Sequence, residues 1–176
     1  MRILGIDPGL RTTGYGAIES LAGAGGRGAQ TAVAPVRLLE AGIVRPDATL
    51  PLEARLGALH RELQAVILAT RPDVMVVEEL WSAYDHPATA VLMGHARGAI
   101  YLAAHLCGVP VRALAHAYVK RVLTGSGAAK KLQVKRAVMQ HLALVTVPEP
   151  DDVSDALALA IAHANLARTE LRVVGA

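Results

Sequence analysis

Apolar residues recur along the chain at two different spacings, which predict strands in some segments and helices in others. Three short apolar segments at 2–7, 15–20 and 36–44 are separated by turn residues and predict consecutive antiparallel strands. A Gly/Ala-rich segment at 21–35 separates the second from the third and predicts a flexible hairpin loop. From Leu52 to Ile67 the apolar positions recur every three or four residues, as in a helix with one buried face.

The next part of the chain predicts parallel strands. The continuous β-branched run at 74–79 is typical of a central strand covered on both faces, and 109–114 predicts another short strand. Further helices are predicted after Asp85, which is a plausible N-cap, and at 116–123, 130–142 and 150–163. We therefore expect an α/β fold in which a five-stranded mixed sheet, antiparallel in its first three strands and parallel in the rest, is flanked by helices.

Length and composition narrow the class of protein. A chain of 176 residues suffices for one well-packed domain, so we expect residues 1–176 to form a single domain. No stretch of about 20 uncharged apolar residues predicts a membrane span. With one cysteine, Cys107, an internal disulfide is excluded, and we expect a cytoplasmic protein without a membrane partner.

Charge is distributed unevenly along the chain. The interval from His86 to Pro148 contains no Asp or Glu and has a net charge of +8, whereas the remainder has a net charge of −5. The basic residues of this interval are Arg97, Arg112, Lys120, Arg121, Lys130, Lys131, Lys135 and Arg136. A surface of one charge sign suits a polyanion, so we expect nucleic acid or phosphate to bind here.

Four carboxylates occupy positions where a structural role is hard to find. Asp7 and Glu78 each end an apolar strand, and the carboxyl ends of parallel strands meet at the same edge of a sheet. Asp152 and Asp155 lie three residues apart near the start of a helix, so they share one helix face. Asp151 and Asp152 could simply complement the helix dipole, but Asp155 is one turn further in.

Together these carboxylates predict a metal-dependent nuclease. Four like charges at close range need a counter-charge, and all-oxygen ligands suit Mg²⁺ or Mn²⁺. Two such ions activate water and stabilise the leaving oxygen of a phosphodiester, with Asp7 as the expected bridging ligand. An RNA–DNA hybrid nuclease satisfies the same chemistry.

The motifs also resemble those of the RuvC family of Holliday-junction resolvases. The similar segments are Gly5–Gly9 with Thr13–Gly16, the strand that ends at Glu78, and Asp152–Ala158. The resemblance implies a ribonuclease-H-like fold, a homodimer, and two Mg²⁺ (or Mn²⁺) ions per subunit at Asp7, Glu78, Asp152 and Asp155. It implies paired nicking of like-polarity strands at a four-way DNA junction, giving ligatable 5′-phosphates, in recombination and repair. It further implies the RuvA and RuvB branch-migration proteins as partners.

The resemblance also suggests residues that contact DNA. Trp81 matches a position where the family often has an aromatic residue that stacks on an opened base, although core packing is the alternative. Lys120 and Lys131 match basic positions near the DNA phosphates. From their charge alone, we expect Lys130, Lys135 and Arg136 to contact DNA as well. The loop at 21–35 is longer than the family pattern suggests.

Other interpretations remain. An actin-like or sugar-kinase-like ATPase also begins with Asp-x-Gly, but it needs a second lobe to enclose the nucleotide. A DNA-binding protein without catalysis gains nothing from four acids that face phosphates. For the dimer contact, two surfaces are candidates: the basic surface, and the small-residue stripe of Ala90, Gly94 and Gly98.

Overall fold

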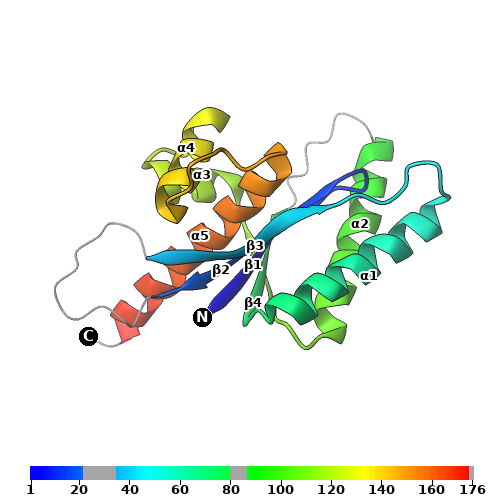
Figure 1. Ribbon diagram of the computed structural model, residues 1–176, viewed down its shortest axis with the longest axis horizontal. Coiled ribbons are helices and arrows are strands. Elements are labelled where there is room, and N and C mark those ends of the chain that lie inside the picture. Colours follow the sequence, from blue (N-terminus) through cyan, green and yellow to red (C-terminus); the bar gives the residue numbers. More distant parts are fainter. Residues whose placement is uncertain (22–34, 80–86, 175–176) are drawn as a thin grey trace.

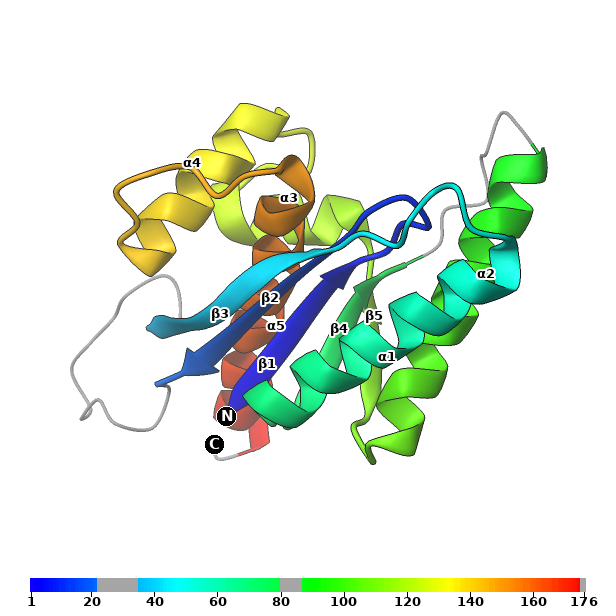
Figure 2. The same ribbon diagram turned by 45° about the vertical axis from the view of Figure 1, so that its right-hand side comes forward.

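The computed structural model describes residues 1–21, 35–79 and 87–174. A five-stranded sheet in the order β3-β2-β1-β4-β5 forms its centre (Figure 2). The strands are β1 (Arg2–Asp7), β2 (Thr13–Ser20), β3 (Val36–Val44), β4 (Val74–Glu78) and β5 (Val111–Leu114). β1, β2 and β3 pair antiparallel, whereas β4 pairs parallel with both β1 and β5. The predicted mixed sheet is confirmed.

In the described residues, five helices are present, and they cover the two faces of the sheet (Figure 1). They are α1 (Leu52–Thr70), α2 (Pro87–Leu106), α3 (His116–Thr124), α4 (Lys131–Leu142) and α5 (Asp151–Val174). One face carries α1 and α2, and the other carries α5 with α3 and α4 packed beside it. In the part of the chain that the structure describes, no helix is long and apolar enough to span a membrane.

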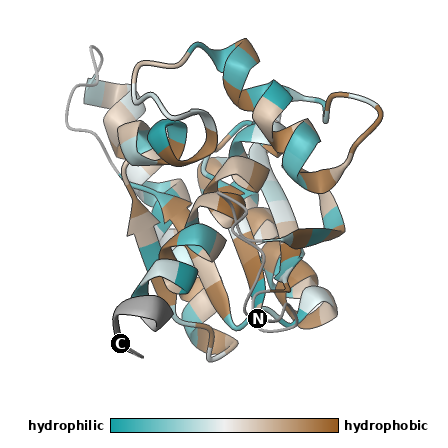
Figure 3. Cartoon of the chain, turned by 90° about the vertical axis from the view of Figure 1, so that its left-hand side faces the viewer, coloured by the Kyte–Doolittle hydropathy of each residue, from teal (hydrophilic) through white to brown (hydrophobic). Residues whose placement is uncertain are grey.

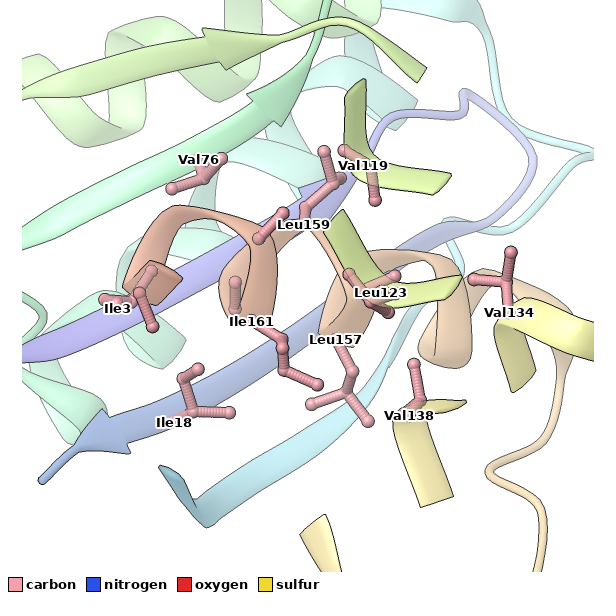
Figure 4. Packing of buried hydrophobic residues seen from close by; sticks show 14 of the residues in the cluster. Ile3, Ile18, Val76, Val119, Leu123, Val134, Val138, Leu157, Leu159 and Ile161 are labelled. Carbon is pink, nitrogen blue, oxygen red and sulfur yellow. The ribbon is translucent and has the colours of Figure 1, made fainter. Parts of the chain in front are cut away.

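Strand alternation divides the core into two layers. Leu4, Ile6, Met75 and Val77 point towards α1 and α2 and pack against residues such as Leu63 and Ile100. The intervening residues Ile3, Val74 and Val76 point towards α5, where they meet Leu157, Leu159 and Ile161 in a second cluster that α3 and α4 close (Figure 4). Because both faces of these strands are covered, consecutive residues of β4 are hydrophobic, whereas the helices carry both hydrophobic and hydrophilic residues (Figure 3). Successive residues of β1 and of β4 therefore contribute their side chains to the two core layers in turn.

Some boundaries differ from the predicted ones. The fifth strand begins at Val111 rather than Val109, because the Val109 amide donates to the Ala104 carbonyl at the end of α2 and Pro110 has no amide hydrogen to donate. The last helix continues to Val174, beyond the predicted end at residue 163. The predicted hairpin loop and the N-cap at Asp85 lie outside the described residues, although the Leu21 amide donates to the Pro35 carbonyl at the base of that loop.

Candidate active site

Asp7 and Glu78 lie side by side at one edge of the sheet. Parallel pairing of β1 and β4 aligns Ile6 with Val77, so the next residue of each strand is one of these two acids. Because Ile6 and Val77 pack towards α1 and α2, alternation turns Asp7 and Glu78 towards α5. The prediction that these two carboxylates are neighbours at one edge of the sheet is confirmed.

Glycines in the first two strands allow α5 to lie directly against the sheet. A Cβ atom on Gly5 would overlap the carbonyl oxygen of Ala156, and one on Gly14 would overlap the carbonyl oxygen of Asp152. Only a residue without a side chain fits such a close approach of backbone to backbone. The first turns of α5, with Asp152 and Asp155, are thereby brought to the ends of β1 and β4.

The pKa of Asp7 reflects its burial and the acids around it. Burial, followed by the negative charges of Asp155, Glu78 and Asp152, raises the pKa of Asp7 from 3.8 to about 7, although Lys131 opposes the rise. The other three predicted carboxylates are therefore all close enough to act on Asp7.

Lys131 brings a positive charge to these acids. Its Nζ lies 3.0 Å from Asp155 Oδ2 and 3.0 Å from Asp151 Oδ2. Burial lowers the pKa of Lys131, but its hydrogen bonds to Asp155 and Asp151 raise it above the ordinary value overall. Lys135 also pairs with Asp151, and the two lysines hold the pKa of Asp151 below its usual range. Asp151 thus anchors two of the lysines that were predicted to contact DNA.

A pocket of about 340 Å³ opens beside the acids. Its lining combines acidic, basic and apolar residues from β1, β4, α3, α4 and α5: Asp7, Glu78, His116, Val119, Lys120, Lys131, Val134, Asp155, Ala158 and Leu159. Lys120 therefore lies at the acidic site, where its charge faces any anion that enters. Lys130 and Arg136 are exposed at the start of α4 and along it, and Trp81 lies outside the described residues.

Sequence reasoning missed His116 and misjudged Arg97. His116 Nδ1 lies 2.7 Å from Glu78 Oε1, so this histidine is a direct neighbour of the site. His116 follows β5, whose Leu114 is paired with Glu78 in parallel register, and this pairing places His116 at the same sheet edge.

Arg97 was counted with the basic surface, but its side chain is only 7% exposed. It does not belong to that surface.

The donor set fits a hard divalent cation. The side chains that gather here offer carboxylate oxygens, which Mg²⁺ and Mn²⁺ prefer. Besides burial, three negative charges raise the pKa of Asp7 and one positive charge, that of Lys131, lowers it. Within the described ranges, no three His, Cys, Asp or Glu side chains already form a metal cage. Binding an ion here therefore requires the carboxylates to reorient, and Asp155 to exchange its pairing with Lys131.

Comparison with known proteins gives consistent matches over almost the whole chain. The family model described as crossover junction endodeoxyribonuclease RuvC matches residues 3–163. The RuvC of Rhodopirellula baltica is 44% identical over 169 residues, which covers 96% of this chain and 89% of the relative. The structure of Thermus thermophilus RuvC is 35% identical with a TM-score of 0.84, covering 97% of both chains. The same enzyme in complex with a Holliday junction substrate is 34% identical with a TM-score of 0.86, covering 97% of this chain and 96% of the other.

Proposed function

Because the chain belongs to the RuvC family of crossover junction endodeoxyribonucleases, we propose that it resolves four-way DNA junctions in recombination and repair. It does so by paired nicks on two strands of like polarity, which leave ligatable 5′-phosphates. The observation that carries this proposal is the gathering of four carboxylates at one sheet edge, next to a pocket whose other wall is basic. A protein that only binds DNA has no use for acids in that position, because they repel phosphates.

The reaction is metal-dependent, and we assign the metal site to Asp7, Glu78, Asp152 and Asp155. This set suits two Mg²⁺ ions, with Mn²⁺ as the alternative. Such ions supply a nucleophile at neutral pH and stabilise the charge on the leaving oxygen. Asp7 is central in this assignment because the other three acids all raise its pKa. Lys131 neutralises Asp155 in the metal-free protein and is available for a phosphate once Asp155 turns to an ion.

DNA contacts are assigned to the basic residues around the pocket. Lys120 and Lys131 line it, and Lys130, Lys135 and Arg136 continue the positive surface along α4. Trp81 is assigned to stacking on an opened base, on the strength of the family resemblance. The printed description of the Thermus thermophilus complex names a Holliday junction as that enzyme's substrate, which supports the same ligand here.

For the partners, we propose a homodimer that forms through the outer face of α2. Val91, Leu102 and Leu106 are 50–59% exposed there, and a Cβ atom on Gly94 or Gly98 would meet no atom within 4 Å. A second copy would bury these apolar residues. The two active sites of such a dimer would make the two cuts.

The remaining proposals on partners and compartment follow from the family resemblance. The RuvA–RuvB complex is the proposed source of the junction, and the cytoplasm is the proposed compartment.

The direct test is cleavage of a labelled mobile four-way junction beside a linear duplex and an RNA–DNA hybrid, in Mg²⁺, Mn²⁺ or EDTA. We expect symmetric nicks in the junction alone, and none in EDTA. Asp152→Asn should bind the junction without cutting it. The matched control is Asp73→Asn, because Asp73 lies at the opposite end of β4, where its carboxylate accepts from the Arg2 amide. Cleavage of the hybrid, or full activity of Asp152→Asn, would overturn the proposal.

A further inference from the structure

One buried cation contacts the catalytic edge from the face opposite to the acids. Arg97 lies in the middle of α2 and is 7% exposed, although an arginine at a surface would keep its guanidinium in water. Removing that charge from water is unfavourable unless its donors find partners. The partners of Arg97 therefore indicate why the residue is there.

The first partner is the main chain of Glu78. Arg97 Nη1 donates to the Glu78 carbonyl oxygen at 2.5 Å. The parallel pairing of β1 with β4 ends at Ile6 and Val77, so this carbonyl lies one residue beyond the last paired position on that side. Arg97 thus supplies a charged donor at the point where the sheet no longer does.

The second partner holds the guanidinium in place. Arg97 Nη2 donates to the Tyr101 hydroxyl at 2.6 Å, and the guanidinium carbon lies 5.3 Å from the centroid of the Tyr101 ring. Tyr101 is one turn further along α2, so both residues are fixed by the same helix. A bond to a hydroxyl and contact with a ring restrict the side chain to one direction, towards the end of β4.

The negative charges at the site indicate what the contact between Arg97 and the Glu78 main chain does. In the absence of an ion, Asp7 is next to three further negative charges, those of Asp155, Glu78 and Asp152. On the β5 side the end of β4 is held by the pairing of Glu78 with Leu114, whereas on the β1 side Glu78 lies beyond the last paired residue. Arg97 holds the Glu78 main chain from the far face of the sheet without contacting the carboxylate. The main chain of Glu78 is then fixed at the sheet edge, and only its side chain has to turn for the carboxylate to meet an ion.

We propose that Arg97 is a positioning residue of the nuclease site: it fixes the end of β4, and so holds the main chain from which the Glu78 carboxylate reaches the metal. This inference rests on the assignment of Glu78 to the metal site. It makes metal affinity, rather than junction binding, the property that depends on Arg97.

The test measures Mn²⁺ binding to the DNA-free protein by the loss of the free Mn²⁺ EPR signal. Loss of a group that orients a ligand typically weakens metal affinity 10–100-fold. For Arg97→Met we expect about a tenfold rise in the Mn²⁺ Kd, a matching rise in the Mg²⁺ concentration that half-saturates cleavage, and an unchanged junction Kd in EDTA. Arg97→Lys should restore part of the affinity, since it keeps one charged donor.

Two further variants keep the result decisive. Tyr101→Phe preserves the ring but removes the hydroxyl, so a smaller loss in the same direction is expected even if Arg97→Met does not fold. Arg121→Met is the matched control: Arg121 also lies over a tyrosine ring, Tyr118, at 5.8 Å, but it belongs to α3 rather than α2. Its Mn²⁺ Kd should equal that of the wild type.

The outcomes separate this inference from the proposed function. If folded Arg97→Met, or failing that both Arg97→Lys and Tyr101→Phe, bind Mn²⁺ like the wild type, the positioning role is wrong while the nuclease assignment stands. If Asp152→Asn binds Mn²⁺ and cuts junctions like the wild type, the metal site itself is wrong.

Discussion

Asp7→Asn should stabilise the metal-free protein at alkaline pH while it abolishes cleavage. The pKa of Asp7 is raised from 3.8 to about 7, first by burial and then by Asp155, Glu78 and Asp152. At a pH between these two pKa values, Asp7 is still protonated in the folded protein but has lost its proton in the unfolded chain. Stability contributed by this group therefore falls as the pH rises from about 4 to about 7, and is level above that range.

The size of the effect follows from the two pKa values. One pH unit corresponds to about 1.4 kcal/mol, so the full loss above pH 7 amounts to roughly 4 kcal/mol. About half of it, roughly 2 kcal/mol, accrues between pH 5.5 and pH 8. The amide of Asn stays neutral throughout, so the variant does not lose this stability. Its advantage over the wild type in the free energy of unfolding should grow by that amount across the interval.

The assay is urea unfolding in EDTA at a series of pH values, with Asp73→Asn as the control, because Asp73 lies at the other end of β4. Adding Mg²⁺ at pH 8 should stabilise the wild type more than Asp7→Asn, since an ion that binds only the folded state adds stability by mass action. A variant whose advantage is independent of pH, or shrinks as the pH rises, would refute the electrostatic account of Asp7.

Three further predictions concern the packing and the charges around the site. Gly14→Ala should lower the free energy of unfolding by about 2–3 kcal/mol in chemical denaturation, because its Cβ would overlap the α5 backbone. Gly57→Ala in α1, whose Cβ would meet only the end of the flexible Arg61 side chain, should leave it unchanged or raise it by up to about 1 kcal/mol. Lys131→Met should tighten Mn²⁺ binding several-fold at low salt, because the ammonium that competes for Asp155 is gone; an unchanged Kd would mean that Lys131 and the ion do not compete. Replacing Lys130 and Arg136 together with Ala should weaken junction binding and reduce the slope of log K against log salt by about 1 to 2; an unchanged slope would remove both from the interface.

The acids could be predicted from sequence because each obeys a local rule. An apolar strand that ends on a carboxylate places Asp7 and Glu78, and a spacing of three places Asp152 and Asp155 on one helix face. The distance between strand and helix follows no such rule. It depends on Gly5 and Gly14, whose missing side chains matter only where α5 crosses the sheet.

Burial and parallel pairing explain what was missed. A count of charges treats every basic residue alike, so it placed Arg97 on the surface although the fold buries it. His116 is 38 positions from Glu78 along the chain and reaches it only because β5 pairs with β4. That neighbour could have been inferred, since the predicted strand at 109–114 ends at the same sheet edge as the strand before it.

The central claim is that Asp7, Glu78, Asp152 and Asp155 form the metal site that cleaves junctions. Anomalous diffraction from crystals grown with Mn²⁺ tests it most directly. The account predicts two Mn²⁺ peaks bounded by these four carboxylates, with Lys131 displaced from Asp155. Peaks elsewhere on the molecule, or none at this edge while the same preparation cuts junctions in Mn²⁺, would contradict it.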